Sequence, residues 1–190
     1  KRPSIYAIAD RVRKRMSAAG GSFADEDVMA ICEEEVYAER AAAGLAFMRQ
    51  RELIRLVFCA LRCELEIIQD LADDPEVTEI MVNGANSIFV ERAGCVSRAE
   101  LSFESRERLE SVIQRLAARV GREMNDLNPI VDARLTDGSR VNAVHASIGI
   151  GGPYLTIRKF NRSRMTMEDL IAQGDISAEA AELLGRLVAA

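Results

Sequence analysis

The spacing of hydrophobic residues divides the chain into a helical first part and a second part that alternates like a sheet. From Leu45 to Leu71, apolar side chains recur every three or four positions, which predicts a long amphipathic helix. A second helix is predicted from Ala24 into the forties, with Ser22 placed to cap it and an acidic first turn. Residues 1–72 are therefore predicted to form an N-terminal helical bundle.

The pattern changes after Asp73-Asp74-Pro75. Residues 77–82 and 88–91 have the apolar, β-branched composition of strands, and the turn-forming run Asn83-Gly84-Ala85-Asn86 between them predicts a β-hairpin. Arg92-Ala93-Gly94 predicts a further turn. The alternation indicates a mostly antiparallel sheet in the second part of the chain.

Helices are also predicted within this second part. Leu109 to Val120 keeps the helical i, i+3, i+4, i+7 pattern, and Gly121 supplies a C-terminal stop. Two shorter helices are predicted at 167–172 and 178–188. The predicted fold class is α+β, with the helical bundle followed by a mixed α/β, PAS-like domain over residues 73–190.

The composition is that of an ordinary globular protein, with 48% hydrophobic and 29% charged residues. A net charge of -5 argues against general nucleic-acid binding, which requires a strongly basic face. No apolar run approaches the roughly 20 residues that span a bilayer, and no signal peptide is visible. Cys59 and Cys63 lie one helical turn apart, but a single histidine and no C-x-x-C motif argue against a metal site.

Two segments carry concentrated positive charge. Lys1 to Arg15 holds six basic residues against Asp10, and we expect it to be a docking or inter-subunit element rather than core. The acidic run from Asp25 to Glu39 could pair with it in cis or in trans. From Asp132 to Arg164, six Arg or Lys residues stand against two Asp, which suggests a local anionic partner, most simply a nucleotide.

Three arginines of the second segment, Arg134, Arg140 and Arg158, fall in predicted adjacent strands. Guanidinium groups suit phosphate because their rigid N–H donors match its oxygens in bidentate pairs. These arginines are the candidate phosphate-contacting residues of the chain. The alternative is a solvated strand face with ordinary surface arginines.

The loop length at Asp137-Gly138 decides where these side chains point. A two-residue loop would pair Leu135 with Arg140 and mix apolar and charged groups on both faces. A three-residue loop over 136–138, with Gly138 in a G1 bulge, pairs Arg134 with Arg140 and separates the two kinds of residue. Because a one-residue slip exchanges the faces, this clean separation predicts the three-residue loop.

Two arginines directly opposite each other repel, so the arrangement requires a compensating negative charge. Asp132, two residues along the same face, could supply that charge. Phosphate oxygens of a ligand are the functional alternative. Arg158 would add a third charge if its strand joins the same sheet.

Four blocks of sequence resemble the N-terminal domain of type II/type IV secretion ATPases. The resemblance covers the chain from about residue 72 to its end, and the nearest branch looks like the Tad/Flp pilus assembly ATPases. The blocks occur in the order and spacing of that family. They are Asp74–Gly84, Phe89–Arg92, Asp132–Val141 and Leu155–Phe160.

The resemblance implies a cytoplasmic, hexameric motor at the inner face of the cytoplasmic membrane, working with an inner-membrane platform protein. As the net charge indicates, no nucleic-acid partner is expected. Such a motor has a RecA-like domain that binds ATP and Mg, expected here after Ala190. No G-x-x-x-x-G-K-[ST] motif occurs in this chain, since Lys1, Lys14 and Lys159 do not provide one. We therefore expect a fragment that is not catalytic alone and needs no cofactor, and a full-length protein that acts as an ATPase.

By matching motifs, the resemblance assigns Arg134, Arg140 and Arg158 to the phosphates of ATP held by the protein's own RecA-like domain. There they would act as arginine fingers in a nucleotide-sensing and oligomerisation domain. Two alternatives stay open. The chain could be a stand-alone PAS-like regulatory or ligand-binding module, or a purely structural domain that docks a platform protein.

Overall fold

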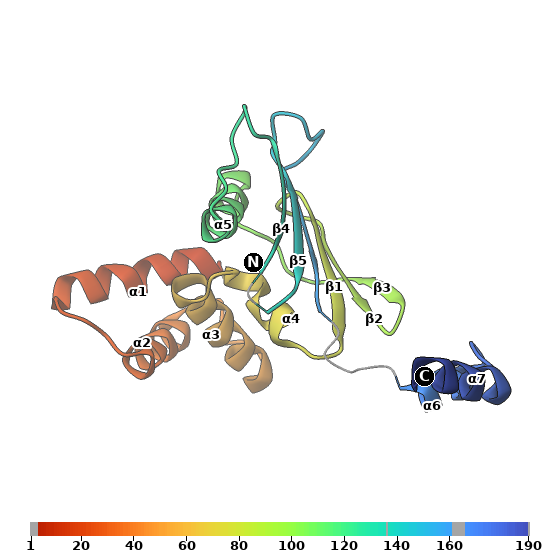
Figure 1. Ribbon diagram of the computed structural model, residues 1–190. Coiled ribbons are helices and arrows are strands. Elements are labelled where there is room, and N and C mark those ends of the chain that lie inside the picture. The colour runs from red at the N-terminus through yellow and green to blue at the C-terminus, as the bar shows by residue number, and fades with distance from the viewer. Residues whose placement is uncertain (1–3, 136, 161–165, 190) are drawn as a thin grey trace. The chain divides into compact units, whose positions relative to one another are not determined.

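A computed structural model describes residues 4–135, 137–160 and 166–189 (Figure 1). The chain divides into two compact units, residues 1–160 and 161–190. The boundary predicted after residue 72 is where helices give way to strands, but residues on both sides of it lie in the first unit and share one hydrophobic core. The α+β prediction is confirmed.

Three helices form the predicted bundle, and their apolar faces meet in its centre. Ser22, predicted to cap the second helix, does not do so. The backbone N–H of Ala24 instead donates to the Asp27 carboxylate at 3.1 Å, and the helix starts one residue later. The helices are α1 (Ile5–Ala19), α2 (Asp25–Ala38) and α3 (Phe47–Arg62).

The described part of the basic N-terminal segment, in α1, contributes to the core, so the prediction that the segment lies outside the core is wrong. Ile8 and Val12 of α1 are completely buried. Two arginines of the same helix, Arg11 and Arg15, pair with the acidic run in cis. Arg11 contacts Glu35 and Glu39 at 2.9 Å each.

The long helix predicted from residue 45 to 71 is broken. Helix α3 ends at Arg62, because Cys63 takes an extended backbone conformation with ψ of 147°. Glu66 then adopts a left-handed conformation with φ of 50°. The chain continues as a short 3-10 helix η1 (Glu66–Ile68) and helix α4 (Gln69–Asp73).

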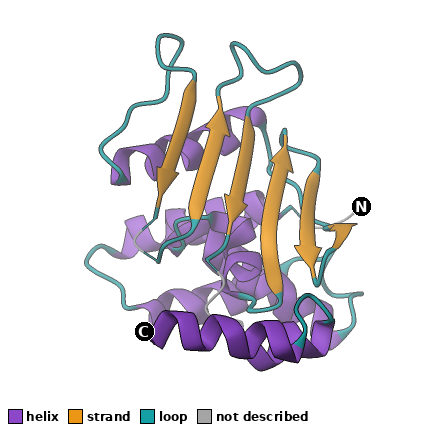
Figure 2. Ribbon diagram, turned by 45° about the vertical axis from the view of Figure 1, so that its right-hand side comes forward, coloured by secondary structure: helices purple, strands orange, loops and turns teal. Residues whose placement is uncertain are grey.

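Six strands form one antiparallel sheet in the order β3-β2-β1-β6-β5-β4 (Figure 2). The hairpin predicted around residues 83–86 is confirmed as β1 and β2, and the next turn leads into β3. The last strand of the sequence therefore lies in the middle of the sheet. The strands are β1 (Val77–Asn83), β2 (Ile88–Arg92), β3 (Cys95–Arg98), β4 (Ile130–Arg134), β5 (Arg140–Val144) and β6 (Tyr154–Arg158).

Helix α5 (Arg106–Arg119) and the bundle lie on one side of the sheet (Figure 1). The Ser105 side chain caps α5, and Gly121 with φ of 67° follows its end, as predicted. The apolar residues of the strands and of α5 fill the layer between sheet and helices. This layer contains Ile80, Val82, Ile88, Val90, Val131, Val141, Leu155, Ile157, Leu109, Val112, Ile113 and Leu116.

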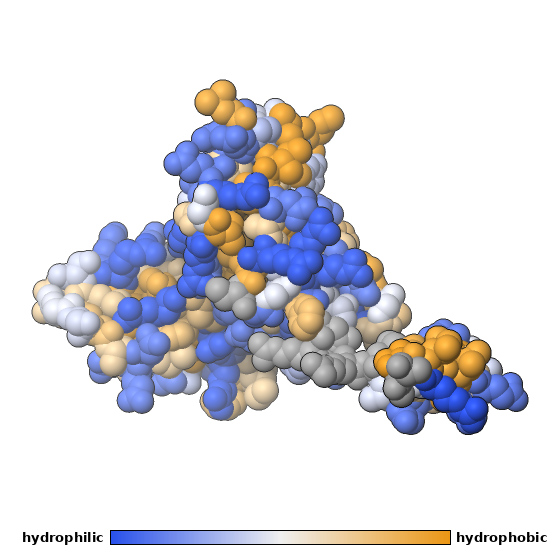
Figure 3. All heavy atoms as spheres, in the orientation of Figure 1, coloured by the Kyte–Doolittle hydropathy of each residue, from blue (hydrophilic) through white to orange (hydrophobic). Residues whose placement is uncertain are grey.

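The other side of the sheet, here called the open face, carries polar and charged residues together with Met81 and Phe89. No described element of the first unit covers it. At one end of the sheet, the loops before β4 and before β6 and the first residue of β4 expose hydrophobic side chains, and Figure 3 shows orange patches at this end. They are Leu127, Ile130, Ile148 and Ile150.

The second unit contains the two predicted C-terminal helices, α6 (Met167–Gln173) and α7 (Ala178–Ala189). Thr166 and Asp169 form a capping box at the start of α6, and Gly174 ends that helix in a left-handed conformation. Leu183 and Leu187 of α7 are exposed. In the part of the chain that the structure describes, no helix has both the length and the apolar character needed to cross a bilayer.

Candidate functional site

The hairpin formed by β4 and β5 has the predicted register. Arg134 lies directly opposite Arg140, and the backbone N–H of Leu135 donates to the carbonyl of Ser139 at 2.8 Å. Gly138 has φ of 88°, a left-handed conformation that favours glycine, and a Cβ there would lie 3.3 Å from the Phe160 ring. The three-residue loop is therefore confirmed, although its residue 136 lies outside the described residues.

The three candidate arginines form a continuous row across the open face. Arg140 lies opposite Arg158 of β6 as well as opposite Arg134. Directly opposite residues share one face, with Cβ atoms about 5 Å apart. Arg134, Arg140 and Arg158 are all exposed, and together we call them the arginine row.

The same line of residues continues with the opposite charge. Arg158 lies opposite Glu79 of β1, and Glu79 lies opposite Glu91 of β2. The open face is thus positive over β4, β5 and β6 and negative over β1 and β2. This separation of charge means that only one half of the face suits an anion.

Asp132 compensates one arginine of the row. Its two carboxylate oxygens accept hydrogen bonds from Nε and Nη2 of Arg140 at 3.0 and 2.6 Å, a bidentate pair. These bonds hold the pKa of Asp132 below its usual range. Arg134 and Arg158 form no ion pair with any other described residue. Two of the three guanidinium groups thus remain available to an external anion.

A hollow of about 520 Å³ opens beside Arg134 and Arg140. Its lining adds Arg122, which the sequence-based search for site residues missed. The backbone N–H of Arg122 donates to the Ala117 carbonyl at 2.9 Å, so the turn at Gly121 fixes its position just beyond α5. The sequence offered one signal for Arg122, its position directly after the predicted helix stop at Gly121. Arg158 does not line this hollow.

The hollow can attract an anion but offers little else to hold one. It brings three guanidinium groups together with one carboxylate. It has no glycine-rich loop of converging backbone N–H groups, the usual cradle for phosphate. Among the residues described, no group of three or more His, Cys, Asp or Glu side chains could hold a metal ion. Charge stabilisation of a phosphate bound mainly by another element is the chemistry that fits.

The Asp132–Arg140 pair can be tested by titration. We expect the Asp132 carboxyl to titrate below the usual value of about 3.9, because Arg140 stabilises its charged form. The Asp132–Arg140 ion pair is fully formed at pH values above the usual pKa of an aspartate, and it is lost as the pH falls through the lowered pKa of Asp132. Carboxyl carbon NMR should show the midpoint moving upward in Arg140→Ala. An unchanged midpoint would show that Arg140 does not hold this carboxylate.

Comparisons with known proteins show which family this chain resembles. The family model described as type II/IV secretion system protein matches residues 62–189 of the chain. The uncharacterized protein MJ0781 of Methanocaldococcus jannaschii is 35% identical over 126 residues, covering 65% of this chain and 17% of that protein. The type IV secretion system protein VirB11 of Brucella suis is 32% identical over 116 residues, covering 58% of this chain and 31% of VirB11.

A solved structure shows the same fold. The crystal structure of the VirB11 ATPase from the Brucella suis type IV secretion system, in complex with sulphate, has a TM-score of 0.54 and 29% identity to this chain. The match covers 66% of this chain and 42% of that one. The matched part of this chain spans 17 to 42% of the length of these relatives, less than half in each case. It belongs to the type II/IV secretion system protein family.

Proposed function

We propose that this chain is the N-terminal domain of a secretion ATPase and that its arginine row supplies positive charge to ATP held by a RecA-like domain of the same protein. One observation carries the proposal. Arg134 and Arg158 are exposed, form no ion pair with another described residue, and lie on either side of Arg140 on the open face of the sheet. Aligned guanidinium groups repel one another, and the approach of an anion relieves that repulsion.

The proposed chemistry is electrostatic stabilisation. During phosphoryl transfer, negative charge spreads over the γ-phosphoryl oxygens, and a positioned arginine stabilises it. Arg134 and Arg158 would contact the phosphates directly. Arg140, whose position is fixed by its hydrogen bonds to Asp132, would add positive potential between Arg134 and Arg158. Strand positions suit this role because their side chains are held more precisely than those of loops.

The finer features of the full-length protein are part of the same proposal. We infer a cytoplasmic hexamer at the inner face of the membrane that works with an inner-membrane platform protein, in the manner of the Tad/Flp branch. ATP and Mg would be bound by the RecA-like domain, with this domain closing over the phosphates. The similarity to VirB11, described as an ATPase of a type IV secretion system, supports the proposal.

Hydrogen exchange tests the proposed contact. In the full-length protein, a non-hydrolysable ATP analogue is expected to slow amide exchange in residues 130–144, because nucleotide would draw the β4–β5 hairpin against the RecA-like domain. This chain alone should show no protection and negligible ATP hydrolysis, since it lacks the Walker A loop. Mass spectrometry of exchanged peptides gives the readout.

The control lies in the same sheet. The β2–β3 hairpin, residues 88–98, sits at the opposite edge and should exchange at the same rate with and without the analogue. If the analogue binds the full-length protein and residues 130–144 remain unprotected, the arginine row does not meet the nucleotide. ATP turnover by this chain alone would contradict the proposal equally.

A further inference from the structure

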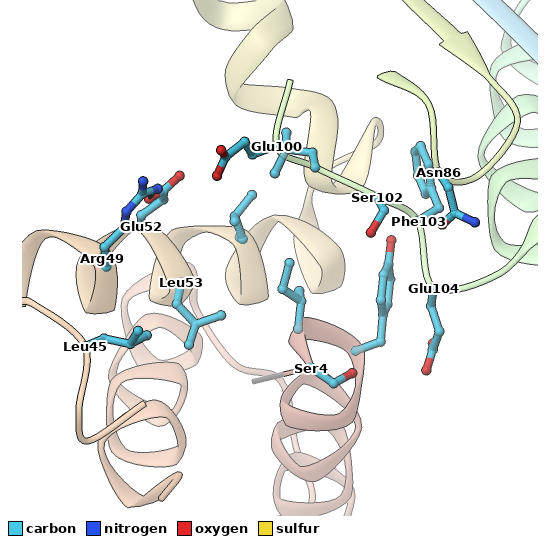
Figure 4. Close-up of a pocket in the computed structure, with 14 residues that line it drawn as sticks. Ser4, Leu45, Arg49, Glu52, Leu53, Asn86, Glu100, Ser102, Phe103 and Glu104 are labelled. Carbon is cyan, nitrogen blue, oxygen red and sulfur yellow. Dashed lines mark hydrogen bonds and ion pairs between the residues drawn. The ribbon is translucent and has the colours of Figure 1, made fainter. Parts of the chain in front are cut away.

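Two hollows of the first unit differ in how their charges are balanced. One, of about 630 Å³, lies between the bundle and residues 100–104 (Figure 4). The one basic residue of its described lining, Arg49, has Nη1 2.9 Å from a carboxylate oxygen of Glu52, so this cation is already paired. The hollow beside the arginine row instead brings three guanidinium groups to a single carboxylate. These groups belong to Arg122, Arg134, Arg140 and Asp132.

The Asp132 carboxylate occupies the place where these positive charges converge. Its hydrogen bonds from Arg140 are the main cause of its lowered pKa, and the charges of Arg122 and Arg134 lower that pKa further. Neither Arg122 nor Arg134 forms an ion pair with another described residue. Asp132 is therefore the internal counterion of all three arginines.

Arg140 binds this carboxylate in the way that arginine binds phosphate. Arg134 is the residue directly opposite Arg140, so Asp132 lies diagonally across from Arg140 on the neighbouring strand. Nε and Nη2 of Arg140 reach its two oxygens at 3.0 and 2.6 Å. Arginine offers the same bidentate edge to two oxygens of a phosphate group. Asp132 thus already fills the anion position on this edge of Arg140.

The pair remains accessible to an external anion. The side chains of Arg140 and Asp132 are 64% and 45% exposed, and exposed pairs of this kind contribute little to stability. An anion that enters the hollow gains the attraction of Arg122 and Arg134. It must then either displace the carboxylate from Arg140 or lie beside it against the repulsion of like charges. In both cases Asp132 lowers the affinity of the hollow for the anion.

We propose that Asp132 is an internal competitor for phosphate groups, which keeps the binding of free phosphate by this hollow weak. Weak binding suits a site whose ligand is held mainly by another domain, because tethering raises the effective concentration of that ligand. After hydrolysis, the same carboxylate favours release of phosphate from the arginines. The role in release rests on the proposed function, whereas the competition does not.

Anion titration of the ¹⁵N-labelled chain tests the competition. The probes are inorganic phosphate and tripolyphosphate, and the amide signals of residues 130–134 and 140–144 report binding. Asp132→Asn removes the charge at nearly constant shape and should bind tripolyphosphate about 10-fold more tightly, because a charge that repels the anion is lost. Inorganic phosphate carries fewer charges and should gain about threefold. An asparagine variant that binds tripolyphosphate no more tightly than the unmodified chain would overturn the proposal.

Two further variants separate the effect of this charge from effects of shape and of net charge. Asp132→Glu keeps the charge, so tripolyphosphate should bind it as weakly as it binds the unmodified chain. Glu91→Gln makes the matched change on β2, three strands from Arg140 in the sheet order. With strands about 4.8 Å apart, this position lies beyond the screening length of about 8 Å at physiological salt and should have no effect. An equal gain in Asp132→Asn and Glu91→Gln would show only an effect of net charge and would contradict the proposal.

The role in release is tested in the full-length enzyme. Inorganic phosphate should inhibit ATP turnover by Asp132→Asn at about threefold lower concentration than in the unmodified enzyme, since the product is held more tightly. If nucleotide protects residues 130–144 and phosphate inhibits both enzymes equally, the role in release is wrong. If residues 130–144 show no protection, the proposed function fails, while the affinity ratio measured on this chain still decides whether Asp132 competes with phosphate.

Discussion

Replacing Arg134 with alanine in the full-length enzyme is expected to lower ATP turnover by about 10³-fold, the loss seen when an arginine that meets the transition state is removed. The same is expected for Arg158→Ala. Neither side chain forms an ion pair with another described residue, so their removal should affect a bound phosphate more than the fold. Steady-state turnover and the melting temperature should be measured on the same preparations.

Lysine variants sharpen this test. Lysine keeps the charge but loses the bidentate fork, so Arg134→Lys and Arg158→Lys should remain impaired at a phosphate contact. Arg140→Ala should also reduce turnover, because it leaves the Asp132 carboxylate uncompensated beside the phosphates. In each case the melting temperature should change little, since these side chains are exposed.

Arg98→Ala is the matched control for the arginine row. Arg98 lies on β3, opposite Phe89, and its side chain shares the open face but stands at the other edge of the sheet. Its loss should leave turnover within about twofold of the unmodified enzyme, as expected for a surface change away from the site. Near-normal turnover in all three arginine-row variants, with folding intact, would refute the phosphate-facing role.

Arg108→Ala is expected to destabilise the first unit by about 3 kcal/mol, the low end of the range for breaking a buried ion pair. Glu66 is 2% exposed. Its carboxylate accepts hydrogen bonds from Nε of Arg108 at 2.9 Å, from Nη2 of Arg115 at 2.6 Å and from the Tyr6 hydroxyl at 3.3 Å. Removal of Arg108 leaves a buried carboxylate with two of its three partners. For a unit of this size the melting temperature should fall by about 6–12 °C.

Arg106→Ala provides the comparison on the same helix. Arg106 forms an exposed i, i+4 pair with Glu110 at 3.2 Å, and such pairs contribute about 0.5 kcal/mol or less. Thermal unfolding of both variants, followed by circular dichroism, separates the two effects. Similar melting temperatures for Arg108→Ala and Arg106→Ala would mean that the hydrogen bond between Glu66 and Arg108 does not hold the bundle against α5.

Local patterns predicted those parts of the structure that depend on local physics. The helical spacing from Leu109 to Val120 with Gly121 behind it corresponds to α5, whose end is two residues short of that stop. Separation of apolar from charged residues selected the register that places Arg134 opposite Arg140. Both inferences needed only side-chain periodicity and the conformational preference of one glycine.

Features that depend on distant contacts were not visible in the same patterns. The apolar spacing runs on past Cys63, but Glu66 turns left-handed there so that its carboxylate reaches Arg108 and Arg115, both far away in sequence. The number of basic residues in the first 15 positions drew attention away from the apolar side of α1, where Ile8 and Val12 are buried. The presence of Arg122 beside the arginine row likewise follows from packing of α5 on the sheet.

The strand order separates the sheet into two halves that can each pair locally. β1, β2 and β3 are consecutive in sequence, as are β4, β5 and β6, and only the β1–β6 pairing joins the halves. Forming this pairing, for example between Val82 and Leu155, brings together residues far apart in sequence. The entropy lost in closing such a long loop should make this the slow step of folding. Glu79 meets Arg158 across this junction, so attraction between the acidic and basic halves would steer them into register as they meet.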